Sequence, residues 1–360
     1  MARTVMVIFG GVSTEYLVSL RSAYAIIGGL RTAGYKVIPV GITPDGAWFR
    51  HLGPDEAILE DRWQEHVAVE QSGPIRSPRD FVTALCGCLP DCIFPAVHGI
   101  NCEDGALQGL LTLSGIPYVG CKVLPSAACM DKAHARKLFR EARLPQCPYV
   151  TVSRRDIARR PQAVVARIAK ICGYPCFLKP SNGGSSVGTC KVERESDLLT
   201  ALEQVSQYDQ TVLVEAFVDA REIEVSVIGR ERPSTGWIGE IDTSNSAAYY
   251  DYQAKYFRDD GARILMPAPL EEPVRRKIRR LAIKAYKTMG CTGLARVDFF
   301  LDRQSGAIYL NEINTLPGFT PISIFPKAFA ATGMPMPALV SRLCRLAMQD
   351  FDQSRRLEHV

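Results

Sequence analysis

The sequence has no apolar run near the roughly 18 residues that a membrane-spanning helix needs. Its N-terminus, Met-Ala-Arg-Thr-Val-Met-Val-Ile-Phe-Gly-Gly, lacks the long apolar core and the cleavage site of an export signal. Dense blocks of Lys or Arg are also missing, and 43 basic residues against 38 acidic ones leave a net charge of only +5. We therefore expect a cytoplasmic protein that binds neither membranes nor nucleic acid.

Cysteine pairs at metal-binding spacing are missing as well. The twelve cysteines are scattered through apolar surroundings, as reduced, buried cysteines usually are. The nearest approach to a ligand cluster, Cys86-Gly-Cys88 with Cys92, has no second pair and no histidines at zinc spacing. A structural zinc site is therefore not expected.

The composition that is present is that of a globular protein: 47% hydrophobic and 22% charged residues in a chain of 360. A chain of this length predicts two or three packed units. The first, residues 1–127, has predicted strands at Thr4–Phe9, Lys36–Ile42 and Asp91–Val97, and predicted helices at Tyr16–Leu30 and Ala106–Leu113. Such alternation is typical of a Rossmann-like parallel sheet with helices on both faces.

The remainder is predicted to form two α+β domains, residues 128–218 and 219–360. Elements expected in the first are helices Asp131–Ala142, Pro161–Ile171 and Ser196–Tyr208, with strands Tyr149–Val152, Cys176–Lys179, Thr189–Val192 and Thr211–Val218. Elements expected in the second are strands Glu222–Ile228, Gly293–Leu301 and Ala307–Leu310, helices Glu271–Met289 and Met336–Gln349, an aperiodic stretch Thr243–Arg258 and a loop Asn314–Pro326. The whole is a mixed α/β and α+β protein.

Two predicted C-terminal strands carry a set of oxygen ligands. Asp298 lies in one, and Glu312 and Asn314 lie two residues apart on the next extended segment, so the latter two point the same way. If the strands pair, three hard oxygen ligands converge, which suits Mg²⁺. The alternative is that all three are solvated polar positions on an amphipathic strand.

A glycine-rich loop follows another apolar strand, Lys179-Pro-Ser-Asn-Gly-Gly-Ser-Ser-Val-Gly188. Its glycines permit close backbone approach, so backbone N–H groups and the hydroxyls of Ser185 and Ser186 could fold over phosphate oxygens, with Lys179 as a point charge. It is not a Walker A loop, because no Gly-Lys-Ser/Thr opens a following helix. Taken alone, such a loop could be a simple turn.

Further residues fit a nucleotide site. Lys132 stands near the start of its helix, where a cation gains nothing from the helix dipole but could meet a phosphate. Glu215 and Glu222 bracket the end of a strand whose backbone edge at Phe217 and Val218 could read adenine, while a carboxylate holds the ribose hydroxyls. Each of these could equally be a surface charge.

Together the motifs resemble the ATP-grasp enzymes and, within them, the D-alanine–D-alanine ligases, along almost the whole chain. The matching segments are Phe9-Gly-Gly-Val-Ser-Thr-Glu-Tyr-Leu-Val-Ser, His98-Gly-Ile-Asn-Cys-Glu-Asp-Gly-Ala-Leu-Gln-Gly, the Lys179–Gly188 loop, Tyr250-Asp-Tyr-Gln-Ala-Lys-Tyr256 and Asn311-Glu-Ile-Asn-Thr-Leu-Pro-Gly-Phe-Thr. The resemblance implies a three-domain fold with ATP between the last two domains and Mg²⁺ or Mn²⁺, as two ions, on its phosphates. It also implies a homodimer.

The resemblance assigns roles around the first substrate. Glu15 would hold the amino group of the first D-alanine in a hydrogen-bonded set with Ser185 and Tyr256, and His98 would line the same site. Lys255 and Tyr256 would belong to a loop that closes over the phosphates and excludes water from the intermediate. A first-turn acid or a lone histidine is otherwise most often structural.

It also assigns roles around the second substrate. Arg296 and the backbone at Gly318 are similar to the groups that stabilise the tetrahedral oxyanion, and Ser323 to the residue that holds the second carboxylate. The implied reaction forms D-alanyl phosphate from ATP and then D-alanyl-D-alanine for peptidoglycan precursors. Ile324 would line the second subsite with an apolar surface, which favours D-alanine.

Two departures from the family pattern bear on these roles. Cys102 stands where the family usually has Gly, and if that position needs a positive φ, we expect strain of about 1–3 kcal/mol. The segment Thr320-Pro-Ile-Ser-Ile-Phe lacks the Ser-His pair common after Pro-Gly-x-Thr. Glu15-Tyr16 resembles the ligases that form D-alanyl-D-serine, so D-serine is the alternative second substrate, with D-lactate behind it.

Two other classes compete with a ligase. One is an ATP-binding protein of this fold without ligase activity, which the presence of Lys132, Lys179 and the three oxygen ligands disfavours. The other is a dinucleotide-dependent oxidoreductase, which is weaker because Gly10-Gly11 is no G-x-G-x-x-G fingerprint.

Overall fold

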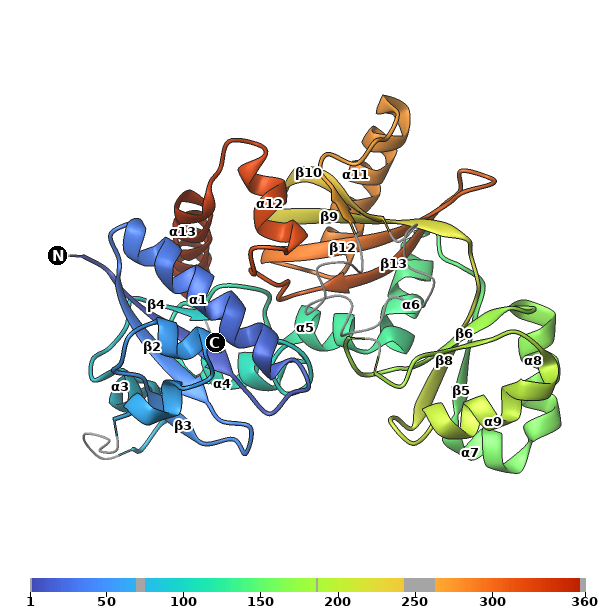
Figure 1. The fold of residues 1–360 in the computed structure, drawn as a ribbon, viewed down its shortest axis with the longest axis horizontal. Coiled ribbons are helices and arrows are strands. Elements are labelled where there is room, and N and C mark those ends of the chain that lie inside the picture. The colour runs from blue at the N-terminus through green and yellow to red at the C-terminus, as the bar shows by residue number, and fades with distance from the viewer. Residues whose placement is uncertain (1, 69–74, 186, 243–262, 357–360) are drawn as a thin grey trace.

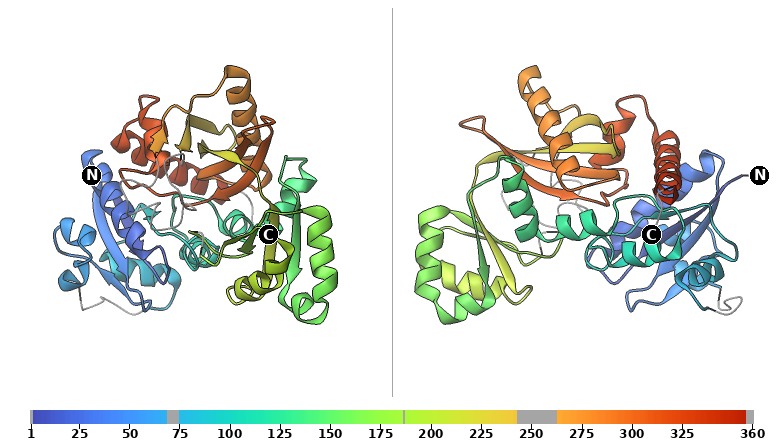
Figure 2. Two further views of the ribbon diagram at one scale, coloured as in Figure 1. Left: turned by 45° about the vertical axis from the view of Figure 1, so that its right-hand side comes forward. Right: turned by 180° about the vertical axis from the view of Figure 1, so that it is seen from behind.

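The computed structural model describes residues 2–68, 75–185, 187–242 and 263–356. In these ranges the strands form three sheets, each built from one contiguous stretch of the chain, in the orders β3-β2-β1-β4, β5-β8-β6-β7 and β11-β10-β9-β12-β13. Figure 1 shows the first sheet with its blue helices, the second in the green lobe and the third beneath the orange helix α11, and Figure 2 shows the same parts from two other sides.

The first sheet is parallel except at one edge. β1 (Thr4–Gly10) pairs in parallel with β2 (Lys36–Ile42) and β4 (Cys92–Pro95), as the sequence predicts, while β3 (Trp48–Arg50) adds an antiparallel edge strand. Its neighbouring helices are α1 (Tyr16–Thr32), α2 (Glu56–Leu59), the 3₁₀ turn Trp63–His66, α3 (Pro78–Cys86), α4 (Ala106–Ser114) and α5 (Val123–Met130).

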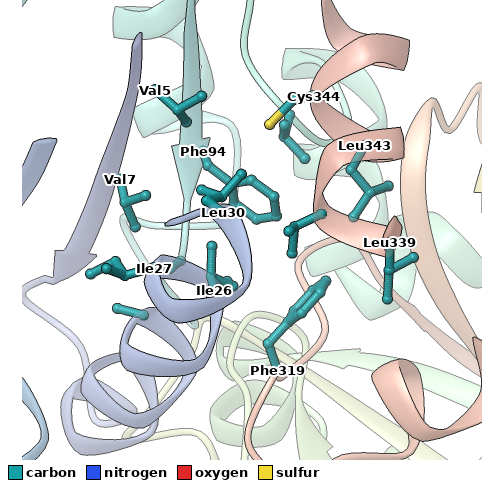
Figure 3. Close-up of a cluster of buried hydrophobic side chains, with 14 of the residues drawn as sticks. Val5, Val7, Ile26, Ile27, Leu30, Phe94, Phe319, Leu339, Leu343 and Cys344 are labelled. Atoms are coloured by element: carbon teal, nitrogen blue, oxygen red, sulfur yellow. The ribbon is translucent and has the colours of Figure 1, made fainter. Parts of the chain in front are cut away.

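Both faces of this sheet are buried, because alternate residues of β1 enter different cores. Val5, Val7 and Phe9 pack with α1 and with α13 (Met336–Arg355), while Met6 and Ile8 pack on the side of α3 and α4. Figure 3 shows Ile26 and Leu30 of α1 and Leu339 and Leu343 of α13 around Phe94 and Phe319. The last helix of the chain therefore covers the first sheet.

The second sheet packs its helices on one face only. Its strands are β5 (Tyr149–Ser153), β6 (Cys176–Pro180), β7 (Cys190–Val192) and β8 (Thr211–Ala216), and its helices are α7 (Arg154–Arg159), α8 (Pro161–Ile171) and α9 (Glu195–Val205). Leu178 and Val214 enter the core beneath these helices. By alternation, Lys179 and Glu215 lie on the opposite face.

The third sheet is antiparallel, with β9 (Ala220–Gly229), β10 (Ser234–Asp242), β11 (Arg263–Leu265), β12 (Gly293–Asp302) and β13 (Ile308–Asn314). Val225, Val297 and Ile313 join a core with α11 (Glu272–Thr288) and with α6 (Lys132–Glu141). The other face of β9, β12 and β13 carries polar residues.

Some predicted elements need correction. The segment Asn314–Pro326 is not all loop, because α12 (Ile324–Ala330) begins inside it and buries Phe325 and Phe329. β13 extends beyond the predicted strand Ala307–Leu310 to Asn314. The predictions missed β3, β10 and β11 among the strands and α2, α3, α5, α7 and α12 among the helices, most of them short.

The twelve cysteines are free thiols, and nine are buried. Among the described residues, no helix is both long and apolar enough to span a membrane.

Candidate functional site

A cluster of cations lies between α6 and the glycine-rich loop. Asp131 caps α6 by accepting a hydrogen bond from the His134 amide at 3.0 Å, which sets Lys132 in the first turn. The Lys132 ammonium donates to the Gly183 carbonyl oxygen at 2.6 Å. Burial lowers the pKa of Lys132 and nearby Lys179 lowers it further, against the carboxylates of Glu312 and Glu215.

Lys179 belongs to a buried network centred on Glu215, which is 3% exposed. The Lys179 ammonium lies 2.9 Å from Glu215 Oε2, and Arg136 pairs with Glu215 Oε1. Burial would raise the pKa of Glu215, but Arg136 and Lys179 together outweigh it and hold that pKa at about 2. Burial lowers the pKa of Lys179, yet Glu215 and Glu312 raise it above its usual value. We call Lys132, Arg136, Lys179 and Glu215 the cationic cluster.

The glycine-rich loop turns back toward the first helix. Gly183 and Gly188 have φ of 140° and 70°, and Ser185 itself has a φ of 51°, a conformation rare outside glycine. In it the Ser185 hydroxyl donates to Glu15 Oε1. A β-carbon on Gly184 would lie 2.9 Å from Glu15 Oε2, so a larger residue there would push against that carboxylate. The structure therefore brings Glu15 and Ser185 together, as the resemblance implies.

His98 lies near Glu15, in a buried pocket of hydrogen bonds. Its Nε2 is 3.0 Å from the Ser22 hydroxyl and its Nδ1 is 2.9 Å from the Leu316 carbonyl oxygen. Burial lowers the pKa of His98, although Glu15 acts in the opposite direction. His98 is therefore neutral near pH 7, and its two ring nitrogens link α1 to the segment before α12.

The condition for strain at Cys102, a positive φ at that position, is not met. Positive φ angles occur at Gly99 (79°), Asn101 (65°) and Gly105 (99°), whereas Cys102 is not among the left-handed residues. Asn tolerates this conformation better than most residues. Cys102 is instead 2% exposed, and a β-carbon on Gly11 would lie 2.7 Å from its sulfur. The thiol fills a gap beside the first loop.

A row of acids crosses the third sheet. Asp298 of β12 is the register partner of Glu224 on β9 and of Glu312 on β13. Arg296 binds two of them: its Nε lies 2.8 Å from Asp298 Oδ1 and 3.0 Å from Glu224 Oε2, and its Nη2 lies 2.7 Å from Asp298 Oδ2. We call Glu224, Asp298 and Glu312 the acidic row.

A β-bulge sets the direction of Glu312. Phe299 pairs with Leu310 and Asp298 with Glu312, so Asn311 is an extra residue on β13. Leu310 and Ile313 both face the core, three residues apart, which a regular strand does not allow. The bulge thereby places Glu312 and Asn314 on the polar face, and Asn311 Oδ1 accepts a hydrogen bond from Lys179 at 3.4 Å.

The predicted metal ligands converge as expected from paired strands. Asn314 Nδ2 donates to Asp298 Oδ2 at 2.8 Å, and Glu312 neighbours Asp298 across the ladder. The Asp298 carboxylate accepts hydrogen bonds from Arg296 and Asn314, and Glu312 lies beside it. Oxygen donors of this kind fit a hard divalent ion. No three His, Cys, Asp or Glu side chains of the described chain gather as a metal site by themselves, so an amide oxygen would have to take part.

The residues predicted for the second substrate meet at the start of α12. The Ser323 hydroxyl lies 2.7 Å from the Thr320 hydroxyl and accepts from the Thr320 amide at 3.1 Å, and a β-carbon on Gly318 would lie 2.9 Å from it. Ile324 is 3% exposed and lies against Gly239 of β10, where a β-carbon would come within 2.9 Å of it. Its side chain thus packs inward.

At the other end of the cationic cluster, β8 leads into the predicted adenine edge. The Phe217 amide donates to the Pro175 carbonyl oxygen at 3.1 Å, and the Phe217 ring lies 5.9 Å from that of Phe177. Val218 follows half-buried, and Glu222 lies on β9 opposite Phe300. Glu215 is turned away from this edge toward Arg136 and Lys179.

Three residues of the site were missed from the sequence. Arg136 lies one helical turn after Lys132, which is the spacing of neighbours on one face and could have signalled it. Glu224 alternates with Glu222 and so shares its face, a second available signal. Asn311 owes its role to the bulge, which the pattern of residues did not reveal. Ser186, Lys255 and Tyr256, predicted to act on the phosphates, lie outside the described residues.

The chain is similar to known ligases along almost its whole length. Residues 4–121 match the family model described as D-ala D-ala ligase N-terminus, and residues 138–345 the one described as D-ala D-ala ligase C-terminus. A D-alanine–D-alanine ligase of Ruminiclostridium cellulolyticum is 41% identical over 98% of this chain and 97% of its own length. One from a Thermoanaerobacter species is 43% identical over 98% and 99%.

Solved structures are similar as well. The VanG D-Ala:D-Ser ligase of Enterococcus faecalis matches with a TM-score of 0.83 and 36% identity, covering 96% of this chain and 100% of that one. The D-alanine–D-alanine ligase of Coxiella burnetii matches with a TM-score of 0.83 and 32% identity, covering 99% and 96%.

Proposed function

This chain belongs to the D-alanine–D-alanine ligase family, and from that premise we propose which of its residues do which part of the reaction. It is an ATP-dependent ligase with the ATP-grasp fold that joins two D-alanines into D-alanyl-D-alanine for peptidoglycan synthesis. One observation carries the proposal: the cationic cluster lies against the acidic row, since Lys179 donates to Asn311 and Arg136 to the Leu310 carbonyl of β13, the strand that carries Glu312. Polyphosphate and its divalent ion belong between them.

On the phosphate side, Lys132 and Lys179 bind phosphate oxygens, and the loop with Ser186 covers them. Lys179 is held by Glu215, so its charge is in place before the nucleotide arrives. Glu222 binds the ribose, and the backbone at Phe217 and Val218 reads adenine. Because the Phe217 amide is already bonded, its carbonyl is the group that meets the base.

On the opposite side, Asp298, Glu312 and Asn314 hold Mg²⁺ or Mn²⁺, as two ions shared with the phosphates. A metal held by these three residues would neutralise charge on the transferring phosphoryl group. Arg296 already pairs with two carboxylates of this region, which compensates part of their charge in the free protein.

The first D-alanine binds beside Glu15, which accepts from its ammonium group in a set with Ser185 and Tyr256. His98, neutral in its buried position, lines this site without adding charge. The substrate carboxylate attacks the γ-phosphate and forms D-alanyl phosphate, while Lys255 helps to cover the phosphates. Exclusion of water protects this intermediate from hydrolysis.

The second D-alanine attacks the acyl carbon and phosphate leaves. Arg296 and the Gly318 amide stabilise the tetrahedral oxyanion, and Ser323, 2.7 Å from Thr320 in the same turn, binds the second carboxylate. D-Alanine rather than D-serine is the second substrate, since the position after Ser323 is apolar and packs inward. The likeness to the D-Ala:D-Ser ligase VanG makes D-serine the alternative to test.

The catalytic unit is cytoplasmic and homodimeric, with domains of residues 1–127, 128–218 and 219–360. The first carries the first-substrate site, and the nucleotide lies between the other two. The three sheets, each from one contiguous stretch, support this division.

The test is mass analysis of the products formed from ATP and an equimolar mixture of D-alanine, D-serine and D-lactate, with phosphate release as a second readout. D-Alanyl-D-alanine is expected as the main product, with a little D-alanyl-D-serine. Phosphate release that does not depend on D-alanine would remove the ligase assignment. A majority of D-alanyl-D-serine would overturn the choice of second substrate alone.

A further inference from the structure

Arg136 is the most deeply buried cation beside the nucleotide site, and no step described above uses it. It is 2% exposed on α6, one helical turn after Lys132. Its Nη2 pairs with Glu215 Oε1, and its Nη1 donates to the Leu310 carbonyl oxygen of β13 at 2.6 Å. One guanidinium thus ties together α6, the second sheet and the third sheet.

A buried ion pair by itself contributes little to stability, because removing both charges from water offsets their attraction. The arrangement around Glu215 is different from a simple pair. Its second oxygen, Oε2, is engaged by Lys179 at 2.9 Å, so two cations share one carboxylate. The three groups keep a net charge of +1 in a buried place, which an anionic ligand would complete.

The geometry points to Arg136 as a positioning residue: by holding Glu215 and the β13 backbone, it aims the Lys179 ammonium at a phosphate of ATP. This inference rests on the proposed function of the site. With Oε1 held by Arg136, the carboxylate presents Oε2 to Lys179, and Asn311 Oδ1 of the bulged strand lies 3.4 Å from the same ammonium. Lysine has three N–H donors, and the described residues direct two of them, which leaves a third for a phosphate oxygen within the described part of the chain.

Arginine is required for this task by its shape. A guanidinium makes several hydrogen bonds in fixed directions, and here it serves the Glu215 carboxylate and the Leu310 carbonyl at once. A lysine at the same position would restore the charge but reach one partner at a time. We therefore expect partial recovery from Arg136→Lys and none from Arg136→Met.

The experiment measures nucleotide binding directly, by calorimetry with ADP and with a non-hydrolysable ATP analogue, alongside steady-state kinetics. Arg136→Met should weaken nucleotide binding and raise the KM for ATP about 10- to 100-fold, with the KM for D-alanine changed less than threefold. The nucleotide affinity of Arg136→Lys should lie between those of Arg136→Met and the wild type. Arg140→Met, at an exposed position of the same helix, is the matched control and should bind like the wild type.

A double-mutant cycle with Lys179→Met separates positioning from a structural role. If Arg136 acts through Lys179, Arg136→Met should have less than a twofold effect on nucleotide binding in the Lys179→Met background. Full additivity of the two changes, or normal nucleotide affinity in folded Arg136→Met, overturns the inference. Should Arg136→Met fail to fold, Arg136→Lys and Arg136→Gln carry the same cycle.

The two proposals fail in different ways. Wild-type protein that binds ATP but releases no phosphate with D-alanine contradicts the ligase function and leaves the role of Arg136 standing. Normal ligation with an unchanged ATP KM in Arg136→Met contradicts only the positioning role.

Discussion

The two charged regions of the site balance their charges in opposite ways. In the cationic cluster, Arg136 and Lys179 pair with the single carboxylate of Glu215 and Lys132 binds a backbone carbonyl, which leaves a formal charge of +2. In the acidic row, Asp298 and Glu224 pair with the single guanidinium of Arg296 and Glu312 neighbours Asp298, which leaves −2. Each region therefore keeps a net charge that suits a ligand of opposite sign: an anion for the cationic cluster, a divalent cation for the acidic row.

The regions also differ in the elements that build them. The acidic row is one face of a sheet, where the strand ladder places neighbouring side chains side by side. The cationic cluster combines a helix with strands of two sheets, and a buried arginine joins them. Strand register brings the charges of the acidic row together, whereas the packing of separate elements brings those of the cationic cluster together. Substitutions should therefore act differently in the two regions.

The largest effect is expected from Glu312→Gln in the acidic row. The change removes a charge that holds the metal and that also faces Lys132 and Lys179. We expect product formation to fall at least about 10³-fold, the scale of several kcal/mol of transition-state stabilisation. Phosphate release and Mn²⁺ titration measure it, with the melting temperature as a check on the fold. Glu203→Gln, at an exposed position of α9, is the control, and near-normal turnover of Glu312→Gln would show that the acidic row does not hold the metal.

Glu215→Gln, in the cationic cluster, should lower both the stability of the protein and its affinity for ATP. It leaves Arg136 and Lys179 buried without their carboxylate, so the free energy of unfolding at pH 7 should fall by about 3 kcal/mol. The folded pKa of about 2 lies below the unfolded value, so the contribution of Glu215 is complete above about pH 5 and is lost as pH falls toward 2.

Urea unfolding of both proteins between pH 7 and pH 3 measures this prediction. The difference in unfolding free energy should shrink as the pH falls, because the wild type protonates the same group. A difference that stays constant over that range would mean that Arg136 and Lys179 do not lower the pKa of Glu215. ATP binding should weaken about 100-fold in the same variant, because Glu215 no longer holds the Lys179 ammonium in place to bind a phosphate.

A smaller effect is expected from Glu224→Gln, which removes one of the two carboxylates on Arg296. Asp298 still binds the guanidinium through two hydrogen bonds, so the arginine should stay in the site but with a less fixed orientation. We expect kcat to fall about tenfold with the KM for ATP unchanged. An increase in the ATP KM of the same size would place Glu224 in nucleotide binding instead.

The smallest effect is expected from Ile324, which lies outside both charged regions. Because the side chain is buried against Gly239, an arginine there would destabilise the fold, and Ile324→Thr is the milder test. The ratio of D-alanyl-D-alanine to D-alanyl-D-serine should fall at most about tenfold, while the KM for ATP and Mn²⁺ binding stay unchanged. Ile324→Val serves as the control without a hydroxyl. An unchanged product ratio in Ile324→Thr would remove this residue from substrate selection.

Much of this protein could be determined from the sequence by itself. Short apolar runs predicted β1, β2 and β4, and the pattern after Gly10-Gly11 predicted α1, because the apolar pattern of a strand or helix is a local property of the sequence. Motifs of consecutive residues, such as the loop after Lys179, identified the family and the chemistry. The spacing of Glu312 and Asn314 predicted that they share a face, and the contact of Asn314 with Asp298 agrees with that prediction.

Only the tertiary structure decided the features that join distant residues. The bulge at Asn311 depends on which residue of β12 pairs with β13, and periodicity within one strand does not carry that information. The positive φ near Cys102 falls on Asn101, because the turn as a whole chooses which residue adopts it. Arg136 gains its role from Glu215 and Leu310, which lie 79 and 174 positions away. Burial of these charges in one place sets their pKa values, and burial is a property of the packed molecule and not of any short stretch of its sequence.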